Sequence, residues 1–268
     1  MTSLEKDLDK LIDIIHGFIQ DKVEKTGSEK VVLGLSGGLD STTVLKLCVD
    51  ALGNDKVLCL IMPESASPDQ DMEDARWLVS EWDVKCHDID IDNILREFPA
   101  SPDNKMAFAN LKARVRMCLE YYYANVESSL VVGTSNKSEL LLGYTTKYGD
   151  SAADFLPVGD IYKSDIRELA KIIGVPKKFL DKVPRAGLWE GQTDEDELGY
   201  TYEEIDEILK GLEKGYSIEK IAESNGISTE DVQDIKARVE ENAHKRKMPT
   251  IAKLRSGTIG VDWREFSD

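Results

Sequence analysis

The chain has 268 residues, which suits one large domain or one domain with a small appendage. Hydrophobic residues make up 41% of it and charged residues 32%, as in an ordinary soluble globular protein, and no apolar run approaches the roughly 18 residues of a membrane span. The formal net charge of −17 argues against a general nucleic-acid-binding protein, because the nucleic-acid phosphates would repel it. Anionic ligands would therefore need a local basic site.

The cysteines and the N-terminus indicate a cytoplasmic protein. Cys48, Cys59, Cys86 and Cys118 have no CxxC spacing and lie in apolar segments, so we expect reduced core residues and neither a disulfide set nor a zinc site. The first residues, Met-Thr-Ser-Leu-Glu-Lys-Asp, lack a signal-peptide pattern.

The first half of the chain predicts alternating helices and strands. Apolar residues at helical spacing indicate amphipathic helices, and short apolar runs indicate buried strands. We expect helices at residues 4–23, 69–81 and 104–124 and one that begins after Gly38, strands at 31–33, 56–62, 84–91 and 128–133, and a loop at 92–103. This alternation is typical of βαβ units in a parallel sheet, in which ligands bind at the carboxyl ends of the strands.

The turn after the first strand has the features of a phosphate-binding loop. Gly37 and Gly38 let the backbone turn tightly and come close to a ligand, and the amides that open the next helix favour an anion. Ser36 and Ser41 add hydroxyl donors, and Asp40 adds a carboxylate that can hold magnesium on the same phosphates. A plain connection between strand and helix is the alternative. The Gly-Lys-Ser/Thr ending of the lysine-bearing P-loop is missing.

A polar, glycine-bearing segment at residues 143–154 favours function over packing. Lys147 can pair with a phosphate or a carboxylate. Asp150 and Asp154 can accept hydrogen bonds from ribose hydroxyls, metal-bound water or an attacking amine. The alternative is a surface loop with incidental charges.

Basic residues gather at two further places. Lys112, Arg114 and Arg116 lie close together on the predicted helix 104–124, either as a binding site or as a solvated stripe. The cluster from His244 to Lys247 ends the last predicted helix, where cations also interact favourably with the helix dipole.

From Pro176 onward the chain becomes mostly helical. A helix at 164–173 precedes this part, and further helices are predicted at 201–213, 217–224 and 228–247. We interpret the acidic run 194–197 as a solvated turn and not as a metal site. The whole chain, 1–268, is expected to form a single domain, with an α/β core at about 29–175 and a helical part at about 176–268.

With these segments placed, the chain resembles the ammonia-dependent NAD+ synthetases, a family within the N-type ATP pyrophosphatase superfamily. The superfamily resemblance rests on the loop Ser36–Ser41. The family resemblance spans nearly the whole length and rests on the segments 110–114, 133–139, 146–150 with Asp154, 189–194 and 244–246. It implies a Rossmann-like parallel sheet flanked by helices, of the adenine nucleotide alpha hydrolase-like type, with a helical C-terminal part.

The resemblance also implies a reaction and its site residues. Deamido-NAD+, ATP and ammonia would give NAD+, AMP and pyrophosphate through an adenylated intermediate, with Mg2+, as the last step of NAD+ biosynthesis. ATP would contact Gly34, Leu35, Ser36, Gly37, Gly38, Leu39, Asp40, Ser41, Thr134 and Lys163. Mg2+ would bind Asp40 and Glu139, and deamido-NAD+ would bind Arg114, Lys147, Asp154, His244 and Lys245.

Two residues are expected to act in the chemistry. Lys163 would neutralise the charge that develops on pyrophosphate. Ammonia must lose protons to become the amide nitrogen, and we hypothesise that Asp150 is the base or the ammonium-binding group.

The chain departs from the family pattern at Arg185, where the family usually has a small hydroxyl residue that touches ATP. No glutaminase domain accompanies the synthetase-like segment, so we expect free ammonia, or a separate partner that delivers it. The family resemblance implies a homodimer, and the predicted helix 104–124 is a plausible interface. We expect no nucleic-acid and no membrane partner.

Rival interpretations are another ATP pyrophosphatase, such as a GMP-synthetase-like amidating module or a tRNA-thiolating enzyme, and a non-catalytic nucleotide sensor. A thiolating enzyme usually needs reactive cysteines and a basic RNA surface. A sensor would be expected to lose some of Asp40, Glu139, Lys147 and Asp150, and all four are present.

Overall fold

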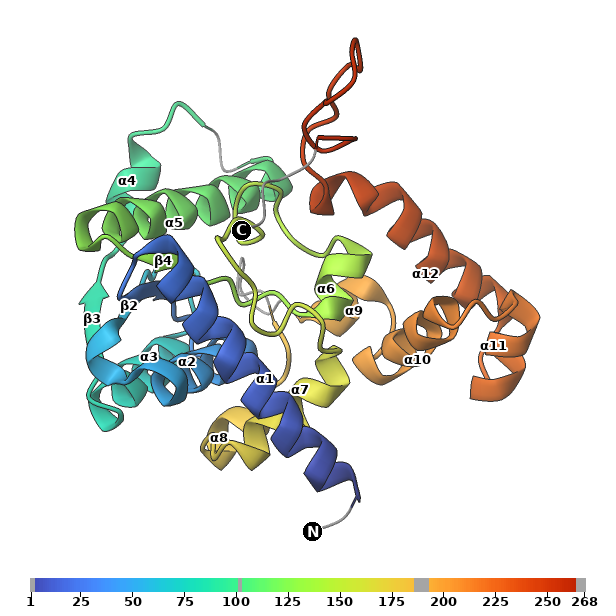
Figure 1. Cartoon of the computed structure of the whole chain (residues 1–268), viewed down its shortest axis with the longest axis horizontal. Coiled ribbons are helices and arrows are strands. Elements are labelled where there is room, and N and C mark those ends of the chain that lie inside the picture. Colours follow the sequence, from blue (N-terminus) through green and yellow to red (C-terminus); the bar gives the residue numbers. More distant parts are fainter. Residues whose placement is uncertain (1–2, 101–102, 186–192, 264–268) are drawn as a thin grey trace.

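Four parallel strands form the central sheet of the protein, seen here in a computed structural model that describes residues 3–100, 103–185 and 193–263, with side chains from residue 10 onward (Figure 1). The strand order is β3-β2-β1-β4. The strands are β1 (Val31–Gly34), β2 (Val57–Ile61), β3 (Lys85–Asp88) and β4 (Leu130–Val131). In register, Val31 lies opposite Val57 on one side and Leu130 on the other. This arrangement confirms the predicted parallel α/β sheet.

Side chains of β1 alternate between two cores, one on each face of the sheet. Val31 and Leu33 belong to the larger core, and Val32 belongs to the core on the opposite face. This alternation follows from the period of two residues in a strand. All three side chains are fully buried, so the strand is apolar on both faces, as parallel strands covered by helices usually are.

Helices cover both faces of the sheet. The larger core is covered by α1 (Ser3–Thr26), α2 (Leu39–Leu52), α3 (Asp69–Glu81), α7 (Lys163–Ile172) and α8 (Lys177–Leu180). The opposite face is covered by α4 (Asp92–Arg96) and α5 (Lys105–Glu127). None of the helices within the described ranges is long and apolar enough to cross a membrane.

The C-terminal helices build a third core of their own. They are α9 (Asp194–Leu198), α10 (Tyr202–Glu213), α11 (Ile218–Asn225) and α12 (Thr229–Glu241), followed by the 3-10 helix η2 (Asn242–Arg246). Reciprocal hydrogen bonds between Thr201 and Glu204 cap α10, and the pair Ser228 and Asp231 caps α12 in the same way. This core joins the rest of the protein through Leu142, at the end of α6 (Lys137–Leu142), and through Tyr162.

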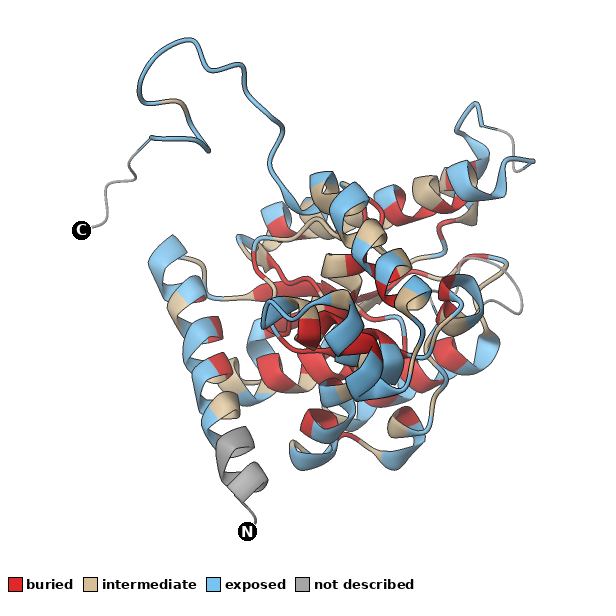
Figure 2. Ribbon diagram, turned by 90° about the vertical axis from the view of Figure 1, so that its right-hand side faces the viewer, coloured by how far each residue is buried: buried red, intermediate tan, exposed pale blue. Residues whose placement is uncertain are grey.

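The chain after η2 is exposed and extends away from the helices (Figure 2). Residues 247–263 contain neither helix nor strand.

The structure differs from the sequence-based expectations in several places. The predicted loop 92–103 begins with α4, because Leu95 buries itself in the core under α5. The predicted strand 128–133 pairs with β1 only over β4, and the last predicted helix leaves α-helical geometry at Glu241. Cys48 and Cys59 are buried as predicted, and Cys86 is half-buried against the larger core, whereas Cys118 is exposed, so the prediction of a core cysteine is wrong for Cys118.

Two helical glycines make a matched pair for testing how this fold is packed. A Cβ on Gly17, in α1, would meet no described atom within 4 Å, whereas a Cβ on Gly211, in α10, would lie 2.7 Å from Cγ1 of Ile221. We expect Gly17→Ala to stabilise the protein by about 0.5–1 kcal/mol, because alanine loses less backbone entropy on folding. We expect Gly211→Ala to destabilise it by about 1–3 kcal/mol, because overpacking outweighs that gain. Urea unfolding measures both; a stabilising Gly211→Ala would contradict the packing described for the third core.

Candidate active site

The loop between β1 and α2 is shaped by the close approach of another backbone segment. Gly37 has a φ of +76°, and a Cβ at this position would lie 2.2 Å from the carbonyl oxygen of Asp71. Only glycine fits both the conformation and the space. Ser36 Oγ lies 3.0 Å from Ser41 Oγ, and Gly38 at the N-cap has no side chain to accept from the first amides of α2. These donors therefore remain available to an anion.

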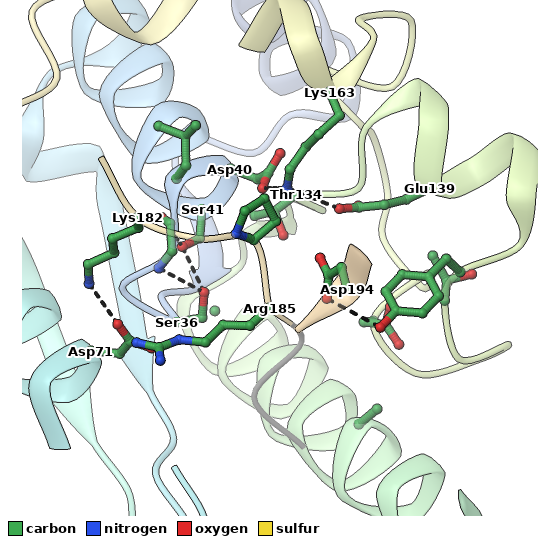
Figure 3. A pocket seen from close by; sticks show the side chains of 18 of the residues that line it. Ser36, Asp40, Ser41, Asp71, Thr134, Glu139, Lys163, Lys182, Arg185 and Asp194 are labelled. Carbon is green, nitrogen blue, oxygen red and sulfur yellow. Dashed lines mark hydrogen bonds and ion pairs between the residues drawn. The ribbon is translucent and has the colours of Figure 1, made fainter. Parts of the chain in front are cut away.

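This loop opens into a cavity of about 860 Å3 at the carboxyl ends of β1 and β2 (Figure 3). A parallel sheet places its ligand sites at this edge. The predicted site residues that line the cavity are Gly34, Leu35, Ser36, Gly38, Leu39, Asp40, Ser41, Thr134, Glu139, Asp150, Lys163 and Lys245. Helix α5, the segment 143–146 and the C-terminal helices complete its walls.

Lys163 joins the two predicted magnesium ligands. Its ammonium pairs with Asp40 and lies 3.4 Å from Glu139 Oε1. The Lys163 side chain is only 8% exposed. Burial alone would lower the pKa of Lys163, but Asp40 and Glu139 raise it above its ordinary value. Lys163 is therefore charged, and Figure 3 shows the three side chains converging.

Of the two carboxyl groups that pair with Lys163, that of Glu139 has a strongly raised pKa. Burial raises its pKa to about 8; Lys163 opposes this shift, and Asp40 and Asp194 add to it. Asn136 orients both carboxylates. Its side-chain NH2 group donates to Asp40 Oδ1 at 3.1 Å, and its backbone amide donates to Glu139 Oε2 at 3.3 Å. The site thus holds two carboxylates and one ammonium in a fixed arrangement.

Asp150 lies in a loop that is tied to two different elements. The backbone amide of Thr146 donates to Asp150 Oδ1 at 2.8 Å, and Thr146 Oγ1 lies 2.8 Å from Asn110 Oδ1 on α5. From the C-terminal side, Lys245 donates to the carbonyl oxygens of Gly143 at 2.6 Å and Thr145 at 3.0 Å. Asp150 is exposed. Desolvation of its carboxyl by the surrounding atoms nevertheless raises its pKa, and hydrogen bonds from Thr146 oppose this rise.

Other predicted residues lie outside the cavity lining. Arg114 is exposed and donates to the carbonyl oxygen of Lys147 at 3.2 and 3.3 Å. Asp154 accepts from the amide of Val131 at 2.7 Å and from Tyr121 at 3.5 Å, so it fastens its loop to β4. His244 is exposed beside Lys245. Within the segment 189–194, residues 189–192 lie outside the described residues.

A second basic group faces Lys163 across the loop. Lys182 donates to the carbonyl oxygen of Gly37 at 2.8 Å and to Asp71 Oδ1 at 2.8 Å. Arg185 pairs with the other oxygen of Asp71 at 2.9 Å. Figure 3 shows Lys182 and Arg185 on either side of Asp71. Sequence reasoning missed Lys182 and Asp71, because neither lies in a recognised motif. The one signal in the sequence was that Lys182 lies three residues before the unusual Arg185.

The three basic residues of the predicted stripe on α5 lie in different environments in the structure. Lys112 is buried and pairs with Glu64 at 2.8 Å, so the solvated interpretation is wrong for it. Arg116 also turns inward and donates to the carbonyl oxygen of Met62 at 3.1 Å on the cavity floor. Burial lowers the pKa of Arg116, although Glu64 and Glu120 oppose this. Only Arg114 of the three is exposed.

The acidic run 194–197 is not a solvated turn, because it forms α9 and its first carboxylate is buried. Asp194 is 4% exposed and accepts hydrogen bonds from Tyr144 at 3.2 Å and from Tyr202 at 3.3 Å. Burial raises the pKa of Asp194, and nearby Lys163 opposes the rise. Glu195 and Glu197 line the cavity as well, and nothing in the sequence of four consecutive acidic residues distinguishes the buried Asp194 from the others.

Comparisons with known proteins agree over almost the whole chain. The family model described as NAD synthase matches residues 11–249. The chain is 47% identical over 256 residues to the NH(3)-dependent NAD(+) synthetase of Methanococcoides burtonii, covering 94% of this chain and 97% of that protein. It is also similar to the solved structure of the NH3-dependent NAD synthetase from Campylobacter jejuni, with a TM-score of 0.77, 38% identity and coverage of 92% and 99%. NMN synthetase from Francisella tularensis gives a TM-score of 0.82 at 35% identity, with the same coverage.

Glu120 offers a test of the electrostatics of the cavity floor. Its Oε1 would lie 2.2 Å from a Cβ built on Gly34, and burial raises its pKa to about 8, while Arg116 lowers it and Asp150 raises it. Between about pH 5 and pH 8 the native carboxyl keeps a proton that the unfolded chain has lost, so stability falls as pH rises through this window. We expect Glu120→Gln to lose this dependence and to gain on the order of a few kcal/mol relative to the unchanged protein by about pH 8.

Thermal unfolding from about pH 5 to pH 8 measures this difference, and Glu223→Gln, on the exposed side of α11, is the control for removing a surface carboxylate. Parallel pH curves for Glu120→Gln and the unchanged protein would contradict the raised pKa.

Proposed function

The chain belongs to the NAD synthase family, and we propose that it amidates deamido-NAD+ to NAD+, using ATP and ammonia and releasing AMP and pyrophosphate. This is the last step of NAD+ biosynthesis. The observation that carries the proposal is the meeting, in one cavity, of the phosphate-binding loop with Lys163, Asp40 and Glu139. An ATP-cleaving amidation needs that combination of anion donors, a fixed cation and carboxylates.

The chemistry explains why ATP is required. A nicotinate carboxylate is a poor electrophile, because the departing oxide is far too basic to leave. Transfer of AMP to the carboxylate creates a good leaving group, and ammonia then displaces AMP. The protein has to align the carboxylate with the α-phosphorus and to stabilise charge on pyrophosphate. The amides that open α2 and the buried ammonium of Lys163 suit the second task.

The carboxylate pair fits a magnesium ion, and we assign Asp40 and Glu139 as its protein ligands. The two side chains already converge on one cation, the ammonium of Lys163. Among the described residues there is no group of three or more histidine, cysteine or carboxylate side chains arranged to hold a metal. Mg2+ commonly takes one or two carboxylates and completes its shell with substrate phosphates and water. The bound ion would neutralise phosphate charge.

Deamido-NAD+ would extend from the cavity along the loop 143–150. Lys245 lines the cavity beside this loop, and Arg114 contacts Lys147 on its outer side. With Asp154 and His244, these residues are the proposed contacts for the dinucleotide. A ligand longer than ATP has to reach beyond the cavity lining, so their outer position suits its distant groups.

We further propose a homodimer in the cytoplasm. Tyr122 and Val126 leave apolar side chains of α5 exposed, at 59% and 60%, and a subunit interface would cover them.

A stoichiometric assay tests the function directly. Purified protein with Mg2+, ATP and deamido-NAD+ should yield NAD+, AMP and pyrophosphate in equal amounts, and only when ammonium chloride is present. Nicotinic acid mononucleotide is the comparison substrate, since one similar structure is an NMN synthetase. Faster amidation of nicotinic acid mononucleotide than of deamido-NAD+ would indicate that the mononucleotide is the substrate. Failure to amidate either one, with ATP still bound, would favour a nucleotide sensor.

The proposed role of Asp150 separates the two half-reactions. Since general-base catalysis contributes about 100- to 10,000-fold, we expect Asp150→Asn to reduce the rate of NAD+ formation by at least about 100-fold. Adenylation does not need this base, so ATP–pyrophosphate exchange with deamido-NAD+ should continue at a nearly normal rate. At higher pH the difference in the rate of NAD+ formation between Asp150→Asn and the unchanged protein should become smaller, because more of the ammonium is then present as free ammonia.

Asp160→Asn is the matched control, because Asp160 lies in the same stretch of chain, is 95% exposed and pairs only with Lys137 among the described residues. Nearly normal amination by Asp150→Asn would contradict the assignment.

A further inference from the structure

A buried polar contact joins the C-terminal helices to the back of the active site. Asp206, on α10, is fully buried. One of its carboxylate oxygens accepts from the hydroxyl of Ser138, on α6, and the other accepts from the amide of Ser164 at 2.8 Å. Ser138 Oγ in turn accepts from the amide of Lys163 at 2.9 Å. Two helices therefore meet the start of α7 through one carboxylate and one hydroxyl.

These contacts replace an ordinary helix cap. The first amides of a helix have no partner within it, and the N-cap residue normally supplies one. Tyr162 holds that position in α7 and makes no capping hydrogen bond. Asp206 and Ser138 satisfy the first two amides from positions 42 and 25 residues away in the chain. Placing a carboxylate there is also favourable toward the helix dipole.

Helix α10 reaches the other end of Lys163 as well. The ammonium of Lys163 lies 5.2 Å from the ring centre of Tyr202, whose hydroxyl donates to Asp194. Lys163 is thus contacted at its ammonium by one residue of α10, and at its backbone by a hydroxyl that another residue of α10 orients. Ser138 also immediately precedes Glu139 in α6, so the contact between Asp206 and Ser138 holds the backbone from which Glu139 extends.

We propose that Asp206 is a positioning residue that, through Ser138, fixes Lys163 and Glu139 relative to the phosphate-binding loop. This inference rests on the proposed function, because it assigns Asp206 to the adenylation step. The C-terminal helices then belong to the catalytic apparatus, although Asp206 itself is not among the residues that line the cavity. A displacement of about 1 Å in a catalytic group can cost about 100-fold in rate, so a cap of this kind can govern turnover.

The same helices provide a matched control. Glu213, near the end of α10, accepts from Tyr162 Oη at 2.7 Å and from Lys137 Nζ at 3.0 Å. Tyr162 and Lys137 directly precede Lys163 and Ser138, so Glu213 joins the same three helical segments. The Glu213 side chain is 56% exposed and lies outside the cavity lining. Removing it tests the attachment of α10 without touching the cap.

The experiment compares Asp206→Asn, Ser138→Ala, the double variant and Glu213→Gln in the full chain. Each is measured for thermal unfolding, for ATP–pyrophosphate exchange with deamido-NAD+, and for NAD+ formation with ammonium. At a temperature where all are folded, we expect Asp206→Asn and Ser138→Ala to lose about 10- to 100-fold in kcat for both reactions. The KM for deamido-NAD+ should stay within about twofold, and Glu213→Gln should retain normal kcat.

Two comparisons separate positioning from support of the fold. The double variant should be about as slow as Asp206→Asn alone, because both residues act through one contact. In a Lys163→Met background, Asp206→Asn should cause a clearly smaller loss of kcat than in the unchanged protein, since one of the two groups that it positions is gone. A lower melting temperature with normal kcat in both single variants would overturn the proposal. So would an undiminished effect of Asp206→Asn in the Lys163→Met background.

If Asp206→Asn does not fold, the milder Ser138→Ala decides by the same criteria. Failure of the proposed function looks different, because the unchanged protein and Glu213→Gln would then both lack NAD+ formation.

Discussion

The ion pair that Lys163 makes with Asp40 and Glu139 is the interaction on which the site depends. Asp40 and Lys163 are 123 residues apart in the chain, and their pairing requires the sheet, α6 and α7 to be in place together. Two carboxylates share one ammonium in a largely buried setting, which leaves an excess of negative charge. Burial is the main cause of the raised pKa of Glu139, and the nearby carboxylates of Asp40 and Asp194 add to it. Such a group is costly without a further cation or proton, and a magnesium ion carried by ATP would supply it.

The parallel sheet explains how distant residues reach this group. The chain leaves β1 into the phosphate-binding loop, leaves β2 toward Asp71, and leaves β4 toward Asn136 and Glu139. All these exits lie at one edge, because parallel strands share a direction. Helix α7 and the segment 182–185 then close the cavity from the larger core. The parallel topology therefore brings the site residues together at one edge of the sheet.

Local signals made the sheet and the loop predictable from the sequence. β2 is a continuous apolar run, and the glycine pair at 37–38 indicates a tight turn, which the structure explains at Gly37 by the close approach of the Asp71 backbone. Contacts between charged residues far apart in the chain could not be predicted from local sequence in the same way. Lys112 lies among basic residues whose spacing is typical of an exposed helical face, yet it is buried in an ion pair with Glu64. Asp194 stands in an acidic run, and only the hydroxyls of Tyr144 and Tyr202 make its burial possible. Charge pairs formed across the fold leave no pattern along the chain.

The pairing of charges also explains how an acidic protein can receive a polyphosphate. Lys163 faces Asp40, Lys182 and Arg185 share Asp71, and Lys245 lies near Asp150. The cations are thus already neutralised within the cavity, and a bare anion would have to compete with resident carboxylates for them. A phosphate that arrives with its own magnesium ion does not face this competition, because the ion brings charge for the carboxylates while the phosphates take the lysines. If the nucleotide binds here with magnesium as proposed, the acidic residues of the site would favour its metal complex over the free anion.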